Sequence, residues 1–194
     1  MAWPIQSLLA RDKLNVRISC RFHIMDVIVR SARPGDGADL ARGWLDGCRY
    51  YAALDPERFQ LPVEHGLVEW FEQLLARPKS LDEVWLVAEV DARVVGHVSA
   101  ELQRPVETAA RQLLRFLGET RLFVSALGVE QAYQRRGVAT RLMEAVEQWG
   151  RERGAVLVSL DTWIHSQLSV PFYEQRMGYR RASIIFEKRL DSPG

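Results

Sequence analysis

The sequence has little of what marks a secreted, membrane-embedded or nucleic-acid-binding protein. Its 194 residues include only two cysteines, Cys20 and Cys48, which are too few for a disulfide framework and favour a reducing, cytoplasmic environment. It contains no run of about 18 apolar residues, so no membrane-spanning helix is expected. Neither sign of charge is in excess, with 26 Lys and Arg against 25 Asp and Glu, so we expect neither nucleic acid nor a membrane surface as a partner.

Residues 1–25 also lack the unbroken apolar stretch of a secretory signal, because charged residues interrupt their apolar groups. A run typical of a strand follows directly after Asp26. We therefore expect residues 1–25 to be an extension outside the compact fold. Residues 26–190 are expected to form a single domain, since this length can bury a substantial core. The ATP-binding pattern Gly-x(4)-Gly-Lys-Ser/Thr is absent as well, which argues against a nucleotide-binding domain of that type.

Hydrophobic periodicity and turn residues predict a mixture of strands and helices. In chain order they predict a strand over 27–30, helices from about 38 and over 63–76, a hairpin of 84–90 and 94–102, a short inserted helix over 105–117, a strand over 122–129, a helix over 137–151, a strand over 156–162, a short helix over about 167–176 and a strand over 180–189. This order predicts an α/β (α+β) fold with a mixed sheet covered on both faces. Strand and helix do not alternate regularly, which disfavours a doubly wound dinucleotide-binding fold.

The segment after the strand over 122–129 carries the clearest chemical pattern. A short loop follows the strand, and then a helix begins with Gly137, which has no side chain, and the small Ala139. The free N–H groups and the dipole of a helix start favour an anion such as a pyrophosphate. Gly137 lets the backbone approach phosphate oxygens, and Arg135 and Arg136 add attraction. Taken alone, the same pattern also fits an ordinary helix start beside a glycine.

Two boxes together resemble those of the GNAT superfamily, the acyl-CoA-dependent N-acetyltransferases. Residues 134–139 (Gln-Arg-Arg-Gly-Val-Ala) match the phosphate loop of that superfamily, Gln/Arg-x-x-Gly-x-Gly/Ala, at all four specified positions. Residues 172–179 (Phe-Tyr-Glu-Gln-Arg-Met-Gly-Tyr) are similar to its second signature, a Tyr-Glu pair followed by Gly and an aromatic residue. The order of strands and helices over 26–190 also fits.

The resemblance implies a mixed, largely antiparallel sheet with helices on both faces and a V-shaped splay between the two central strands. Main-chain groups left unpaired in the splay would bind the pantetheine arm of acetyl-CoA, the implied co-substrate, and no metal is expected. The residues that the resemblance assigns to this cofactor are Leu127, Gly128, Val129, Gln134, Arg135, Arg136, Gly137, Val138, Ala139, Thr140 and Ser166. At Ser166 the chain departs from the superfamily, where an asparagine is frequent.

The implied reaction is direct attack of an amine on the thioester, with no enzyme nucleophile. Tyr173 matches the residue that donates a proton or hydrogen bond to the departing sulfur, although a tyrosine that only packs in the core would also fit this position. A main-chain N–H near Leu127 or Val129 would polarise the thioester carbonyl. Glu101 is the first candidate for the general base that deprotonates the ammonium, and Asp161 and Glu130 come next; each also fits a surface carboxylate.

The acceptor side is implied to lie in residues 38–76 and in the insertion 104–120. Aromatic and acidic residues in the first region would suit a cationic amine, but they also fit a core with a solvated face. The insertion is expected to cover the acceptor pocket or to contact a second subunit. The expected activity is transfer of an acetyl group to a primary amine of a small molecule, in a chain that forms a homodimer. The alternatives are an acetyltransferase for protein N-termini or lysines, and a non-catalytic acyl-CoA sensor.

Overall fold

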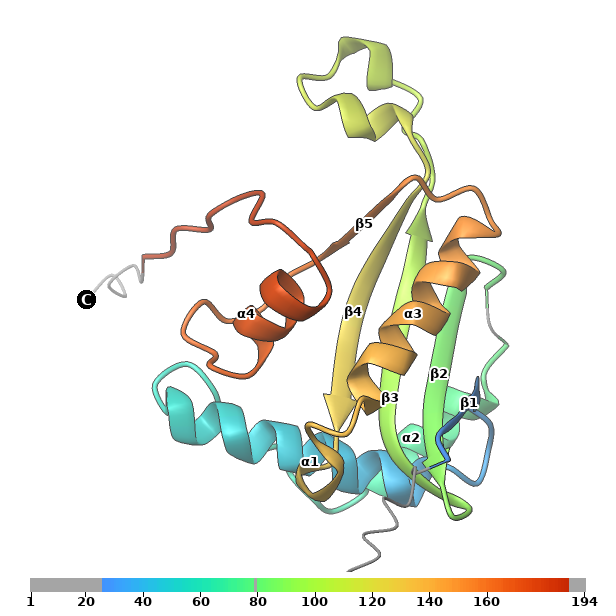
Figure 1. Ribbon diagram of the computed structural model, residues 1–194, viewed down its shortest axis with the longest axis vertical. Coiled ribbons are helices and arrows are strands. Elements are labelled where there is room, and N and C mark those ends of the chain that lie inside the picture. Colours follow the sequence, from blue (N-terminus) through green and yellow to red (C-terminus); the bar gives the residue numbers. More distant parts are fainter. Residues whose placement is uncertain (1–25, 79, 189–194) are drawn as a thin grey trace, which may run out of the picture.

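The computed structural model describes residues 26–78 and 80–188, and its centre is one five-stranded sheet (Figure 1). The strands lie side by side in chain order, and the first three pairings are antiparallel while β4 and β5 are parallel. The strands are β1 (Ile28–Ser31), β2 (Glu83–Val90), β3 (Arg93–Gln103), β4 (Arg121–Val129) and β5 (Leu157–Leu160). The predicted mixed, largely antiparallel sheet is confirmed.

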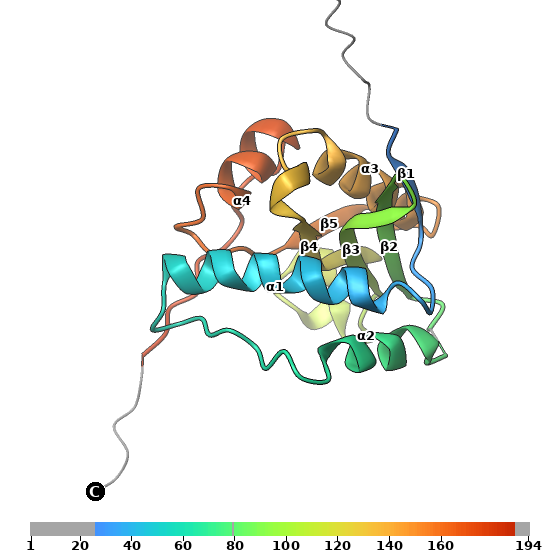
Figure 2. The same cartoon turned by 90° about the horizontal axis from the view of Figure 1, so that it is seen from below.

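Helices cover both faces of the sheet, as Figure 2 shows from below. The long helix α1 (Gly37–Leu54) and α2 (Leu67–Ala76) lie on one face. On the other face lie α3 (Val138–Arg151) and the short α4 (Ser169–Pro171), which runs directly into a π-helical turn, η4 (Phe172–Arg176). Two layers of helix around one sheet leave the edges and ends of the strands as the places where main-chain groups are accessible.

Each face of the sheet has its own apolar core. On the α3 side, Leu142 and Val146 are fully buried against Val98 and Leu122 of the sheet. Apolar residues at a helical spacing of four thus meet apolar residues that alternate along the strands. On the α1 and α2 side a second, smaller cluster is built from Ala32, Leu40, Ala41, Phe71, Leu75, Val87 and Val94. Because both faces are covered, β3 is buried along almost its whole length.

The two central strands separate halfway along β4. Parallel pairing with β5 runs only from Arg121 opposite Leu157 to Val124 opposite Leu160. Beyond Val124, β4 continues to Val129 while β5 turns away from it (Figure 1). The register with β3 shifts at the same point and leaves Ser125 as an extra, bulged residue. The predicted splay is confirmed, and it begins at this bulge.

Two sequence predictions are wrong. The insertion over 105–117 does not form one helix; it forms two short 3₁₀ turns, η1 (Ala109–Arg111) and η2 (Arg115–Gly118). Its apolar spacing has no face to bury against, because the insertion projects beyond the end of the sheet and Leu113 is 97% exposed (Figure 1). Residues 180–188 are not a strand either, and position 189 lies outside the described residues. A run of strand-forming residues needs a neighbouring edge, and this segment is held instead by side-chain pairs of Arg181 with Glu174 and of Glu187 with Arg58.

The predicted boundary between an extension and the domain concerns residues 1–25, which lie outside the described residues. In the part of the chain that the structure describes, no helix has both the length and the apolar character needed to span a membrane.

Candidate functional site

The corner between β4 and α3 is shaped to receive an anion. The chain leaves β4 at Val129, passes through the 3₁₀ turn η3 (Gln131–Tyr133) and reaches Gly137, which has φ 84° and directly precedes α3. A Cβ atom at Gly137 would meet no other atom within 4 Å, so open space lies beside its backbone. The first turn of α3 contains no acidic residue, and the helix dipole therefore makes this end positive without local cancellation.

The N–H groups of Val138, Ala139 and Thr140 belong to the first turn of α3, which has no carbonyl partners within the helix. The first bond onto the helix cap runs from the Arg141 N–H to the Gly137 carbonyl over 3.1 Å. Val138 is buried, so only its main chain is available at this corner. Free N–H groups at the positive end of a helix dipole favour an anion such as a phosphate, so the start of α3 is a candidate anion site.

The loop before Gly137 is tied to β4. The Gln134 side-chain amide donates to the Val129 carbonyl over 3.1 Å. Arg135 has a positive φ of 60°, and the Arg136 guanidinium lies 5.9 Å from the ring centroid of Tyr133. Both arginines are exposed. Gln134 therefore fixes the loop, and the two arginines supply positive charge at its surface.

The part of β4 beyond Val124 has no β5 partner and is called here the free half of β4. Along this free half the side chains divide between the two faces of the sheet. Leu127 and Val129 pack against the α3-side core. Gly128 is paired with His97 of β3, and a Cβ atom at Gly128 would lie 2.6 Å from Cε1 of the His97 ring. A side chain at 128 would therefore force the buried histidine ring to shift, which favours glycine at this position. Because these side chains point to the two faces of the sheet, the edge of β4 that faces the splay presents main-chain N–H and C=O groups.

Tyr173 lies in η4 and packs against the same core as α3. Burial raises the pKa of its phenol, and the nearby Tyr51 and the charge of Asp161 raise it further. The phenol is therefore protonated at neutral pH and can act as a hydrogen-bond or proton donor. Asp161 follows the last paired residue of β5, Leu160, which places it where the splay opens.

Ser166 is held inside the protein. It is 2% exposed, its hydroxyl accepts the Ser169 N–H over 3.0 Å, and it shares a 3.2 Å hydrogen bond with the Tyr50 hydroxyl. The residue thus caps the start of α4. Sequence reasoning missed Tyr50 as its partner, since the two residues are 116 positions apart.

The three candidate bases have different surroundings. Glu130 is buried and accepts hydrogen bonds from Arg42 over 2.8 Å and from Arg93 over 2.7 Å, so this carboxylate already holds α1 to the sheet and is the poorest candidate of the three. Glu101 is exposed on β3. Its partner on β4 is Phe123, which lies two positions before the bulged Ser125.

Within residues 26–78 and 80–188, no group of three or more His, Cys, Asp or Glu side chains is arranged to hold a metal.

A second hydroxyl pair marks the start of the splay and was also missed from the sequence. The bulged Ser125 donates to the Ser99 carbonyl over 3.2 Å, and the two hydroxyls lie 2.9 Å apart. Ser99 is the register partner of Trp85 on β2, and Trp85 packs in the α1- and α2-side core. Partners in a sheet share a face, so these hydroxyls point to the side of α1 and α2.

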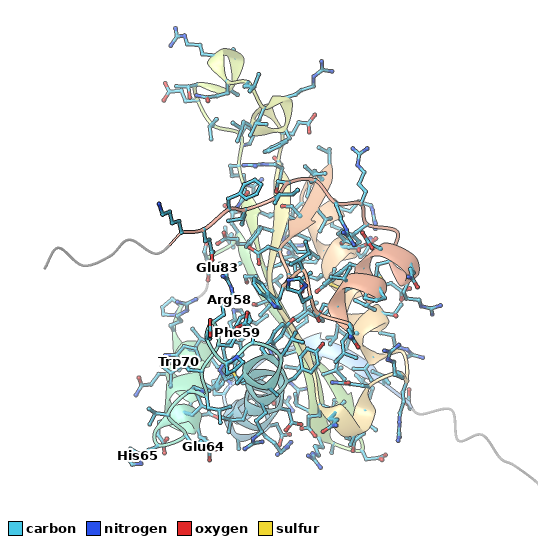
Figure 3. The ribbon with its side chains drawn as sticks, turned by 90° about the vertical axis from the view of Figure 1, so that its left-hand side faces the viewer. Arg58, Phe59, Glu64, His65, Trp70 and Glu83 are labelled. Carbon is cyan, nitrogen blue, oxygen red and sulfur yellow. The ribbon has the colours of Figure 1, made fainter. Side chains whose placement is uncertain are left out.

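The aromatic residues of the acceptor side are only partly brought together. Tyr51, Phe59 and Trp163 form a continuous row, with ring centroids 5.1 and 5.7 Å apart. The Arg58 guanidinium lies 4.4 Å from the Trp163 ring centroid, and Figure 3 labels Arg58 and Phe59 on this face of the molecule. Trp44 is not part of the row, since its ring lies against Phe71.

The sequence profile of the Acetyltransferase (GNAT) family matches residues 44–179. This stretch covers more than half of the chain and includes the free half of β4, the start of α3 and Tyr173. The chain therefore belongs to the GNAT family of acetyltransferases. It is an acyltransferase by family, built on the fold described above.

Individual proteins are similar to the chain in sequence or in fold. An uncharacterized N-acetyltransferase of Bacillus subtilis (strain 168), YdgE, is 29% identical over 68 residues, which are 35% of this chain and 43% of that relative. The chain thus spans less than half of that relative's length. A solved transcriptional regulator from Bacillus halodurans C-125 superimposes with a TM-score of 0.63 and 21% identity, covering 85% of this chain and 100% of the other.

Two further solved structures share the fold. A mutant of the BH1408 protein from Bacillus halodurans has a TM-score of 0.71 and 16% identity over 84% of this chain and 99% of its own. The aminoglycoside N-acetyltransferase AAC(6')-Iy, solved in complex with CoA, has a TM-score of 0.58 and 17% identity over 87% of this chain and 97% of its own. At such identities the likeness shows the fold alone.

Proposed function

We propose that the protein transfers an acetyl group from acetyl-CoA to a primary amine of a small molecule. The observation that carries this proposal is the free half of β4. It leads from the splay through a short loop to Gly137 and the start of α3. An extended strand edge followed by an anion site has the shape and polarity needed for a pantetheine arm joined to a pyrophosphate. The GNAT family match supports the same reading.

The residues present fit the coenzyme. Gly137 has no atom within 4 Å of a would-be Cβ, which leaves room for phosphate oxygens beside its backbone. We assign the pyrophosphate to the N–H groups over 137–140, with Arg135 and Arg136 adding charge. We assign the pantetheine arm to the main chain of β4 from Leu127 to Val129. Ser166 is expected to support α4, because its hydroxyl already has two partners.

Acetyl-CoA supplies the thioester carbonyl that the amine attacks, and the chain's own groups stabilise the charges. A main-chain N–H at Leu127 or Val129 donates to the carbonyl oxygen as negative charge develops, an effect typically worth about 3 kcal/mol. Tyr173, whose buried phenol is neutral at neutral pH, donates its proton or at least a hydrogen bond to the departing thiolate. Glu101, or failing that Asp161, accepts the proton of the attacking ammonium.

A small cationic acceptor is supported by the surroundings of the splay. Aromatic faces attract cations. In the row of Tyr51, Phe59 and Trp163, the Arg58 guanidinium already lies against the rings of Phe59 and Trp163. Aminoglycoside N-acetyltransferases are among the structures of similar fold. Amines of this multiply charged kind are the first to test.

One observation favours a protein amine as a second candidate acceptor. The insertion 104–120 projects beyond the end of the sheet, away from α1 and α2 (Figure 1). The sequence left open whether the insertion covers the acceptor pocket or contacts a second subunit, and an acceptor side without such a cover suits a polypeptide chain. Comparison of peptides carrying free N-termini or lysines with free small amines separates the two candidates.

The test is acetyl-CoA turnover across an amine panel with the wild type and the variant Tyr173→Phe. We expect the variant to lower kcat about 100-fold, the usual effect of losing a general acid, and to bind acetyl-CoA as the wild type does. Equal kcat values would remove the role of Tyr173. Glu101→Gln and Asp161→Asn compared at the same pH identify the base, since only the variant lacking the base loses kcat strongly.

A further inference from the structure

Two consecutive tyrosines near the end of α1 are tied to the turn that starts α4. The Tyr50 hydroxyl lies 3.2 Å from the Ser166 hydroxyl, and the Tyr51 hydroxyl lies 3.1 Å from the Ser169 hydroxyl. The rings of the two tyrosines meet edge to face, with centroids 5.2 Å apart. Two adjacent residues of one helix thus hold both ends of a single four-residue turn.

The turn is closed by its own bonds as well. The Ser166 hydroxyl accepts the Ser169 N–H over 3.0 Å, and the Val170 N–H reaches the Ser166 carbonyl over 3.3 Å. A serine hydroxyl has one proton and two acceptor positions, so Ser166 is largely satisfied by Tyr50 and the turn. The pairs are partly buried, which makes the loss of either partner costly.

This turn sets the position of Tyr173. Helix α4 has only three residues and continues without a break into η4, where Tyr173 stands four residues after Ser169. So short a helix is not stable alone and depends on tertiary contacts. Tyr51 is also close enough to Tyr173 to influence its phenol electrostatically. The phenol ring of Tyr173 therefore rests on a segment whose start is anchored by α1.

We propose that Tyr50 and Tyr51 are positioning residues that hold Tyr173 toward the splay through the Ser166–Ser169 turn. The inference rests on the proposed acetyl transfer, in which Tyr173 is the proton donor. Neither tyrosine needs to touch the coenzyme. Because α1 also carries part of the aromatic row beside the splay, the same helix fixes both the acceptor wall and the proton donor.

The experiment compares Tyr50→Phe and Tyr51→Phe in the full chain with the wild type, using acetyl-CoA and the best amine from the panel. Each change removes one hydroxyl and keeps the ring. We expect kcat to fall about tenfold, the effect of losing one hydrogen bond of about 1.4 kcal/mol, with an unchanged KM for acetyl-CoA. Ser169→Ala removes the Tyr51 bond from the other side and should give the same loss. Ser166→Ala removes the Tyr50 bond together with the bond that accepts the Ser169 N–H, and should lose at least as much.

A double-variant cycle distinguishes positioning from general weakening. In a Tyr173→Phe background, adding Tyr50→Phe should lower kcat less than about twofold, because the group being positioned has gone. A full additional tenfold loss in that background would overturn the inference, as would wild-type kcat in both single variants. Ser80→Ala, which removes a hydroxyl that accepts the Asp82 N–H before β2, is the matched control and should leave kcat unchanged.

A second readout keeps the inference independent of turnover. Amide hydrogen exchange over 166–176 should become about tenfold faster in Tyr50→Phe and remain unchanged in Ser80→Ala. Unchanged exchange in Tyr50→Phe overturns the inference. A wild type that acetylates no amine counts against the proposed function instead.

Discussion

At the scale of single residues, the contact between His97 and Gly128 shapes the middle of the sheet. The imidazole is 3% exposed and lies across Gly128, where the free half of β4 passes. It also lies parallel to the Trp85 ring, with centroids 6.4 Å apart. Burial lowers the pKa of the imidazole to about 4, so the ring is uncharged at neutral pH and packs as a spacer between the two strands.

Gly128→Ala should therefore destabilise the fold. The new methyl group would lie 2.6 Å from His97 Cε1, and relief of such overpacking typically costs about 1–3 kcal/mol. Urea unfolding measures the loss. The control is Gly47→Ala on α1, where a Cβ meets nothing within 4 Å and alanine should hold or raise stability by up to about 1 kcal/mol. A Gly128 variant as stable as the wild type would show that the ring moves aside freely.

His97 also predicts how stability depends on pH. Its folded pKa of about 4 lies below the ordinary 6.5, so between those pH values the unfolded chain binds a proton that the folded chain does not. The stability contributed is complete above about pH 6.5 and is lost as pH falls towards 4, by up to about 3 kcal/mol. Urea unfolding across this range should show a shallower decline in His97→Gln. Parallel curves would mean that other groups set the decline.

At the scale of elements, α3 lies between two glycines in the same backbone conformation. Gly137 precedes the helix and Gly154 follows it, both with φ 84° and both with no atom within 4 Å of a would-be Cβ. A left-handed conformation favours glycine at both positions. Only Gly137 lies at the proposed phosphate corner, so the pair separates backbone strain from ligand binding.

Gly137→Ala and Gly154→Ala should each lose about 1 kcal/mol of stability, because both impose the same strain. Only Gly137→Ala should also weaken acetyl-CoA binding, by about tenfold or more, since its methyl group occupies the space beside the first N–H groups of α3. Calorimetric titration with acetyl-CoA measures the difference. Equal affinities in the two variants would contradict the assignment of the pyrophosphate to this corner.

At the scale of the whole molecule, the splay leaves the sheet incomplete in its centre. β4 is paired on both sides only as far as Val124, and beyond the bulge at Ser125 residues 126–129 have only β3 as their strand partner in the described structure. A ligand that binds only the folded chain and fills this place adds its binding free energy to stability. Thermal unfolding is therefore a direct probe of the proposed coenzyme.

Acetyl-CoA at about 100 times its Kd should stabilise the fold by about 2.7 kcal/mol, seen as a raised Tm. Pantetheine lacks the pyrophosphate and ATP lacks the pantetheine arm, so each should raise Tm less at equal concentration. No shift with acetyl-CoA would argue against the whole coenzyme assignment. The expected homodimer stays a prediction, which sedimentation of the same samples tests.

The elements that could be predicted from sequence are those whose signal is local. The spacing of Val138, Leu142 and Val146 predicts the buried face of α3, and Gly137 predicts where that helix begins. The strand before it and the hairpin of β2 and β3 follow from short-range alternation and turns. For the same reason the proposed phosphate corner, formed within a dozen consecutive residues, could be proposed from the sequence, and it stays a prediction.

Only the tertiary structure decided the parts that depend on distant partners. The pairs of Tyr50 with Ser166 and of Arg42 with Glu130 join residues 116 and 88 positions apart, and no local pattern specifies them. The insertion and residues 180–188 were mispredicted for a related reason. Apolar spacing and strand propensity indicate which structure a segment can adopt. A short helix, however, forms only where its apolar face can be buried, and a strand forms only where it can pair with the edge of another strand.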